Sequence, residues 1–135
     1  MTDCSVALVV SADRQVRQLI AAGLDRIGCT AVDVATSQEG LACAGASRVD
    51  FLILDVSLPG ALEPDMVRRL RGEQPDLKVL YLLGPAYGVF DHSCAVGRID
   101  AYLLKPFALH QLCDVVACWL NDEVTRANTT TLSLN

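Results

Sequence analysis

One carboxylate and one ammonium group stand where they can do chemistry together. Asp55 closes the uninterrupted apolar run 51–54, and Lys105 directly follows the run 101–104. Burying an acid next to so apolar a segment is costly without a partner, which indicates that Asp55 has a use. We therefore expect the two side chains to form a one-to-one ion pair that neutralises a pocket without metal. The alternatives are an inert strand-end acid and a solvated surface lysine.

The elements that must position this pair follow from the hydrophobic pattern. Short apolar runs alternate five times with stretches of helical period. The runs, which predict strands, are 6–10, 30–34, 51–54, 79–83 and 101–104. Helices are predicted after 13, from 37 to about 46, around 66–70, less clearly at 86–96, and from 109 to about 120. This order predicts an α/β fold in which helices cover both faces of a parallel sheet.

Local signals mark several boundaries of these elements. Gly28 stands where a helix should stop, and Thr36 with Glu39 predicts a capping box. Pro59 and Gly60 predict a loop. In an open parallel sheet, chemistry gathers outside the carboxyl ends of the strands. The residues at those ends are Ser11, Ala12 and Asp13, then Asp55, then Leu83 and Gly84, and finally Lys105 and Pro106.

Composition limits the class of protein. The 135 residues fit one domain, and 52% of them are hydrophobic, against 20% charged, which predicts a large core. A net charge of −5 argues against a nucleic-acid surface. No apolar run reaches the roughly 20 residues of a membrane helix, and the first residues carry an acid where a secretory signal carries a base. We expect a cytoplasmic protein that binds neither nucleic acid nor membrane.

Several reactive residue types have two interpretations. The six cysteines contain no C-x-x-C pair, so they are expected to be small core residues, with redox sensing by one of them as the alternative. His92 and His110 are expected at the surface. The cluster Arg68, Arg69 and Arg71 is expected to be a solvated helix face, with contact to a partner as the alternative.

Two segments carry a resemblance to a known family. FLILDVSLPG (51–60) and DAYLLKPF (100–107), at the ends of the third and fifth predicted strands, resemble the CheY-like receiver domains of two-component response regulators. The resemblance covers residues 4 to about 120. It implies a flavodoxin-like (βα)5 three-layer sandwich with a five-stranded parallel sheet in the order 2-1-3-4-5. The receiver domain would occupy residues 1–120, and residues 121–135 would form a flexible polar tail or linker.

The resemblance also implies roles for individual residues. Asp55 corresponds to the phosphoacceptor, Lys105 to the lysine that contacts the phosphoryl group, and Tyr102 to the aromatic switch position. The bond before Pro106 corresponds to the cis peptide of the family.

The chain departs from the family at other positions. Ser11 and Ala12 stand where receivers carry an acidic pair, and Leu83 stands at the switch Thr or Ser position. Asp55 with Asp13 would therefore hold Mg²⁺ only weakly, so no cofactor is certain. The simplest interpretation of Asp13 is an acid at a helix N-terminus.

These features favour a degenerate receiver, a phosphorelay module rather than an enzyme, with weak or no Mg²⁺-dependent phosphorylation. The alternative is a functional receiver that accepts a phosphoryl group from a histidine kinase on Asp55. A flavodoxin-like cofactor binder would need a glycine-rich loop after the first strand, where residues 11–14 read SADR.

The expected partners are a histidine kinase or phosphotransfer protein, or an output domain. The resemblance implies a contact face formed by 86–96, 101–104 and the final helix, through which two copies would also pair.

Overall fold

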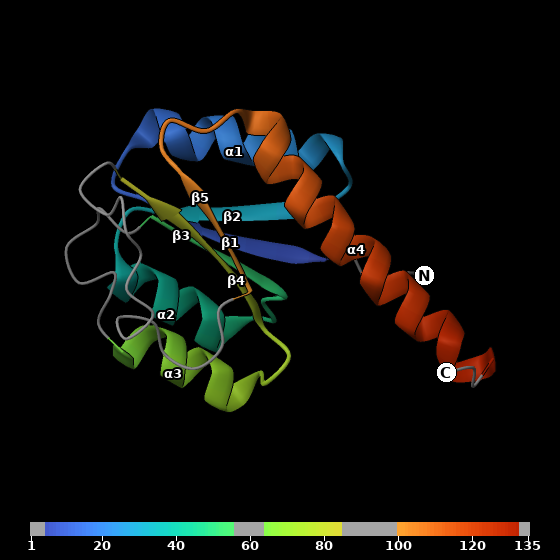
Figure 1. Cartoon of the computed structure of the whole chain (residues 1–135). Helices are drawn as coiled ribbons and strands as arrows, with labels where there is room; N and C mark the ends of the chain where they lie inside the picture. Colours follow the sequence, from blue (N-terminus) through green and yellow to red (C-terminus); the bar gives the residue numbers. More distant parts are fainter. Residues whose placement is uncertain (1–4, 56–63, 85–99, 133–135) are drawn as a thin grey trace.

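Strands and helices follow one another in the predicted order throughout the residues that the structure describes (Figure 1). The computed structural model describes residues 5–55, 64–84 and 100–132, and the predicted loop at Pro59 and Gly60 and the predicted helix at 86–96 lie outside them. The strands are β1 (Val6–Val10), β2 (Thr30–Val34), β3 (Phe51–Asp55), β4 (Lys78–Leu83) and β5 (Ala101–Leu104). The helices are α1 (Arg14–Arg26), α2 (Ser37–Ala46), α3 (Pro64–Glu73) and α4 (Leu109–Leu132).

The strands form one parallel sheet in the order β2-β1-β3-β4-β5, which confirms the predicted topology. Helices α1 and α4 lie on one face of this sheet, and α2 and α3 lie on the other (Figure 1). The result is the predicted three-layer sandwich. Among the described residues, no helix is both long and apolar enough to cross a membrane.

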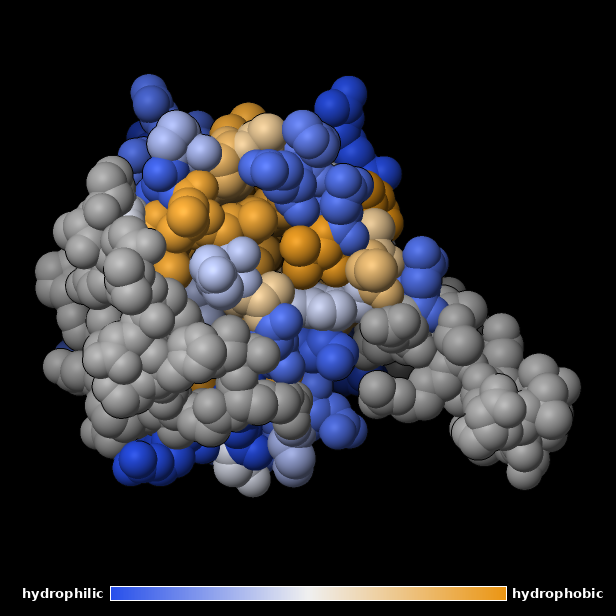
Figure 2. Space-filling model, in the orientation of Figure 1, coloured by the Kyte–Doolittle hydropathy of each residue, from blue (hydrophilic) through white to orange (hydrophobic). Residues whose placement is uncertain are grey.

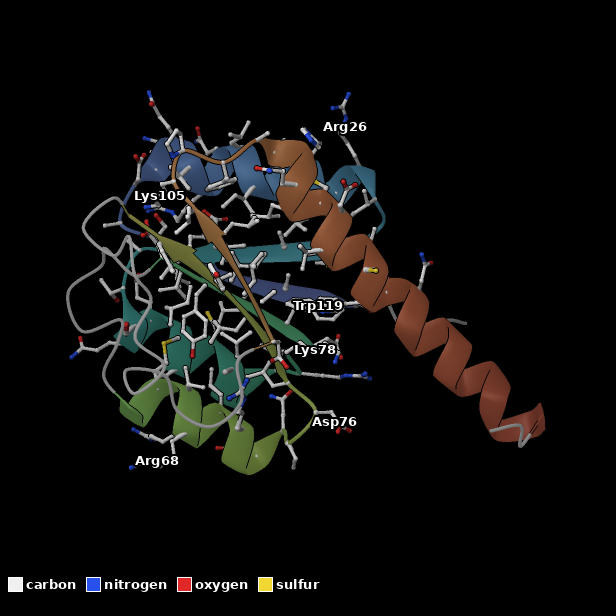
Figure 3. The ribbon with its side chains drawn as sticks, viewed as in Figure 1. Arg26, Arg68, Asp76, Lys78, Lys105 and Trp119 are labelled. Carbon is white, nitrogen blue, oxygen red and sulfur yellow. The ribbon has the colours of Figure 1, made fainter. Side chains whose placement is uncertain are left out.

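Side chains that alternate along the strands enter two separate cores. Leu52 and Leu54 join the cluster beneath α2 and α3, whereas Phe51 and Ile53 join the cluster beneath α1 and α4. In the second cluster the Phe51 ring lies 5.5 Å, centroid to centroid, from the ring of Trp119 (Figure 3). Burial on both faces explains why the third strand is apolar at every position before Asp55.

The local signals at Thr36 and Gly28 are confirmed. Thr36 accepts a hydrogen bond from the Glu39 amide at 3.1 Å, and the Glu39 carboxylate accepts one from the amide of Ala35 at 3.2 Å. Gly28 follows α1 with φ of 83°, a left-handed conformation that glycine adopts without steric cost. Both devices act within one helical turn, which is why the sequence alone could locate them.

Helix α4 extends beyond its predicted end near residue 120 and continues to Leu132. In Figure 1 its last turns project away from the sheet. Residues 121–132 are polar, which suggested a flexible tail, but they contain neither glycine nor proline. Polarity alone does not end a helix, because the backbone hydrogen bonds do not depend on it.

The basic cluster on α3 is not uniformly solvated, as the sequence had suggested. Arg68 and Arg69 are exposed, and Figure 3 shows Arg68 pointing away from the body. Arg71 instead forms an ion pair with Asp100 at 3.0 Å, in which the side chains are only 13% and 8% exposed. Asp100 also accepts a hydrogen bond from the Val79 amide at 2.8 Å. The prediction was wrong for Arg71, because its partner lies 29 residues away along the chain.

The same pair lies close to Tyr81. Burial raises the pKa of the Tyr81 hydroxyl above its ordinary value, Arg71 acts in the opposite direction, and Asp100 raises it further. The phenol therefore stays protonated in the core at neutral pH.

The contact between α1 and α4 depends on a small residue at Gly23. A Cβ atom there would lie 3.0 Å from Cys113 Sγ and 3.0 Å from a methyl group of Leu109. We expect Gly23→Val to lower the free energy of unfolding by about 1–3 kcal/mol, because the added atoms overpack this contact. Gly72→Val, whose side chain enters open space on α3, is the matched control. Equal effects of the two substitutions in urea denaturation would contradict this account of the packing.

Removing Arg71 leaves the buried carboxylate of Asp100 without its cation. We expect Arg71→Ala to cost about 3 kcal/mol of folding free energy, as breaking a buried ion pair does. The exposed Arg68→Ala should change stability by less than about 0.5 kcal/mol. Chemical denaturation of the two variants side by side tests the assignment, and a similar small cost for both would refute it.

Candidate functional site

The Asp55–Lys105 ion pair lies at the carboxyl edge of the sheet. Asp55 is the last residue of β3 and only 2% exposed. The Lys105 amide donates to the carbonyl oxygen of Leu83 at 2.7 Å, which continues the β4–β5 ladder beyond its last strand pair. The Lys105 ammonium then lies 2.7 Å from Asp55 Oδ1. The one-to-one pair expected from the sequence is therefore present, and Figure 3 labels Lys105 at this edge.

The second oxygen of Asp55 is also engaged. Ser11 follows β1 directly and is fully buried, and its hydroxyl donates to Asp55 Oδ2 at 2.8 Å. The sequence identified Ser11 only as a position without the expected acid. Its hydrogen bond was missed because the contact joins residues 44 apart in the chain.

The backbone of Ser11 is held from two sides. Its amide donates to the Val34 carbonyl at 3.1 Å, and its carbonyl accepts a hydrogen bond from Arg17 Nη1 at 2.7 Å. Arg17 also pairs with Asp33 Oδ2 at 3.2 Å. No sequence pattern singled out Arg17, because its partners lie on the loop before its own helix and on the neighbouring strand. Together these contacts orient the Ser11 hydroxyl toward Asp55.

No second acid from the loop after β1 joins the Asp55–Lys105 pair, because Asp13 caps a helix and position 12 is an alanine. Asp13 is the N-cap residue of α1, and its Oδ1 accepts hydrogen bonds from the amides of Gln15 at 2.9 Å and Val16 at 3.3 Å. This contact confirms the helix-terminal interpretation of Asp13, whereas its metal role stays a prediction. Ala12 is exposed.

The described residues of this pocket do not fit a Mg²⁺ ion well. Mg²⁺ is held in proteins through one or two carboxylates together with water and phosphate oxygens. Here the carboxylate of Asp55 is paired on one oxygen with a cation, Lys105, and on the other with Ser11. Within the described part of the chain, no group of three or more His, Cys, Asp or Glu side chains is placed to hold a metal ion.

The two predicted switch residues lie on β4 and β5. Leu83 ends β4 with its side chain fully buried in the cluster beneath α2 and α3. Tyr102, on the edge strand β5, is 48% exposed and paired in register with Tyr81. The bond between Lys105 and Pro106 is cis, as the resemblance implies. The switch role of Tyr102 stays a prediction.

Loss of the Lys105 ammonium would leave the Asp55 charge buried. We expect Lys105→Met to lower the free energy of unfolding by about 3 kcal/mol at neutral pH, and the double variant Lys105→Met/Asp55→Leu to recover much of that loss. Lys78→Met at the opposite edge of the sheet is the matched control. Denaturation curves that give equal costs for both single lysine variants would show that the ion pair does not support the fold.

Comparison with known proteins agrees with this architecture. A model of the response regulator receiver domain matches residues 7–117. Response regulator MprA of Mycobacterium tuberculosis is 35% identical over 109 residues, covering 78% of this chain and 46% of MprA. Sensor kinase CckA of Brucella abortus is 28% identical over 118 residues, covering 86% of this chain and 12% of CckA. The chain thus spans less than half the length of either relative.

A solved structure shares the whole fold. The CheY-like response regulator receiver domain protein of Methanospirillum hungatei superimposes with a TM-score of 0.75 at 20% identity, covering 92% of this chain and 99% of that one. At this identity the likeness shows the fold alone, and the match to the family model carries the assignment. The chain belongs to the response regulator receiver domains, CheY-like signalling modules of two-component systems rather than ordinary enzymes.

Proposed function

We propose that this chain is a degenerate receiver that works through protein–protein contact, with weak or no Mg²⁺-dependent phosphorylation. One observation carries the proposal: both carboxylate oxygens of Asp55 have a hydrogen-bond donor from the chain itself, Lys105 on one and Ser11 on the other. The pocket is therefore charge-balanced without a metal ion or a phosphoryl group. Such a domain can keep one conformation in the absence of a phosphorylation signal.

The chemistry of phosphoryl transfer supports this proposal. An oxygen of Asp55 would have to attack phosphorus while Lys105 and Ser11 hold the carboxylate, and the residue is only 2% exposed. Catalysis of this reaction depends on neutralising the charge of the transferred group, which metal ions usually do. The carboxylate of Asp13 caps α1 and is occupied there. The described pocket thus offers one ammonium group, that of Lys105, and one carboxylate that does not cap a helix, that of Asp55.

The alternative is a functional receiver that accepts a phosphoryl group from a histidine kinase on Asp55. The favouring observation is that Lys105 lies 2.7 Å from Asp55, where its ammonium can also neutralise a phosphoryl oxygen. In this reaction the Asp55–phosphorus bond forms as the donor's bond to phosphorus breaks. Lys105 would then exchange the Asp55 carboxylate for the phosphoryl group as its partner.

We propose a histidine kinase, a phosphotransfer protein or an output domain as the partner, and the cytoplasm as the location. The similarity to a segment of the sensor kinase CckA supports a kinase context. Tyr102 and Leu104 on β5 are 48% and 50% exposed. Figure 2 shows apolar surface in the upper middle of the view, where Figure 1 draws β5 between α1 and α4. This apolar character supports β5 and α4 as part of a contact face, for a partner or for a second copy.

Incubation with a small phosphodonor or with beryllofluoride, at millimolar Mg²⁺, separates the two functions. We expect no gain in intact mass with the phosphodonor, and no change in the NMR spectrum with beryllofluoride, because the pocket does not hold the metal. Asp55→Asn is the control for specific reaction at this residue. A gain of one phosphoryl group in the unmodified protein that is absent from Asp55→Asn would establish the functional receiver instead.

A further inference from the structure

The Ser11 hydroxyl connects Asp55 to the start of α1. It donates to Asp55 Oδ2 at 2.8 Å, and its oxygen accepts a hydrogen bond from the Asp13 amide at 3.1 Å. A hydroxyl has a single proton, so while Asp55 is ionised Ser11 donates to Asp55 and accepts from the Asp13 amide. We call these two hydrogen bonds the relay. Ser11 is fully buried, so bulk water does not substitute for either contact.

The relay continues into the first turn of the helix. The Asp13 carbonyl accepts a hydrogen bond from the Arg17 amide at 3.0 Å, and the Asp13 carboxylate caps the amides of Gln15 and Val16. The Arg17 guanidinium in turn holds the Ser11 carbonyl at 2.7 Å. The backbone of Ser11 is thus held by hydrogen bonds at both its amide and its carbonyl.

Hydrogen bonds in series polarise one another. A hydroxyl that donates to a carboxylate becomes a better acceptor, so the charge on Asp55 strengthens the hydrogen bond from the Asp13 amide. Leu83, by contrast, has an apolar side chain buried in the cluster beneath α2 and α3. This side chain offers no polar atom through which a change at Asp55 can pass.

We propose that Ser11 is a positioning residue that transmits the state of the Asp55 carboxylate to the first turn of α1. The surface that responds to a change at Asp55 through Ser11 is then the amino end of α1, with Asp13 and Arg17. The proposal rests on the proposed function only in taking Asp55 as the residue at which the change occurs. Its test uses neither metal nor phosphodonor. The relay can therefore be refuted while the proposed function stands, and the proposed function can be refuted while the relay stands.

Asp55→Asn is the informative perturbation, because it keeps the shape of the side chain and removes one acceptor. Lys105 and Ser11 both donate to Asp55, but an asparagine side chain has one oxygen and one NH2 group. With Lys105 on the oxygen, the NH2 group faces Ser11 and forces its hydroxyl to accept. The Ser11 oxygen is then shared with a second donor, and the hydrogen bond from the Asp13 amide weakens.

The readout is the amide signal of Asp13 in ¹H–¹⁵N NMR spectra, together with its hydrogen-exchange rate. We expect Asp55→Asn to displace the signals of Asp13, Gln15 and Val16 and to speed exchange at Asp13 up to about tenfold, the effect of losing about one hydrogen bond. In a Ser11→Ala background, Asp55→Asn should add no further change at these amides. Ser11→Thr, which keeps the hydroxyl, should restore the response.

Ser37→Ala is the matched control, because the Ser37 hydroxyl is buried without a hydrogen-bond partner among the described residues and lies on α2. It should leave the response of Asp13 to Asp55→Asn intact. If Asp55→Asn leaves the three amides unchanged, or changes them equally when Ser11 is alanine, the relay is refuted. Should Ser11→Ala fail to give the dispersed spectrum of a folded protein, Ser11→Cys, with its weak donor, takes its place.

Discussion

The buried charge of Asp55 is the constraint on which the carboxyl edge of the sheet depends. An ionised carboxylate that is 2% exposed is stable only if partners replace the water it has lost. Those partners come from two other strands: Ser11 follows β1, and Lys105 follows β5. The positions of three strand ends are therefore tied to one side chain, and a shift of β1 or β5 would remove one of these hydrogen bonds to the charge.

A second buried ion pair acts at the opposite end of the same strands. Asp100 immediately precedes β5, bonds to the amide of Val79 in β4 and pairs with Arg71 of α3. The β4–β5 ladder is thus held by charge at its amino end and, through Lys105, at its carboxyl end. Between these two points β4 is buried after its first residue, whereas Tyr102 and Leu104 of the edge strand β5 are about half exposed.

The family membership and the details of the pocket lead to different conclusions. The fold and the family match assign the chain to the receiver domains, and the proposed loss of metal-dependent chemistry comes from three residues at one edge. In the proposed function, Ser11 supplies a hydrogen-bond donor where the family resemblance implies an acid, and Lys105 balances the charge of Asp55. Function in such a fold resides in the site and not in the architecture, because the same sheet supports either outcome.

The sequence by itself determined what depends on near neighbours and on simple rules of sheet geometry. The apolar runs located the strands, Gly28 and Thr36 marked helix ends, and the carboxyl-edge rule brought Asp55 and Lys105 together. The tertiary structure alone decided that the Ser11 hydroxyl is the second partner of Asp55, as it decided the Arg71–Asp100 pair. The two contacts join residues far apart in the chain, whose approach is set by strand register and helix packing. No pattern within one segment carries that information.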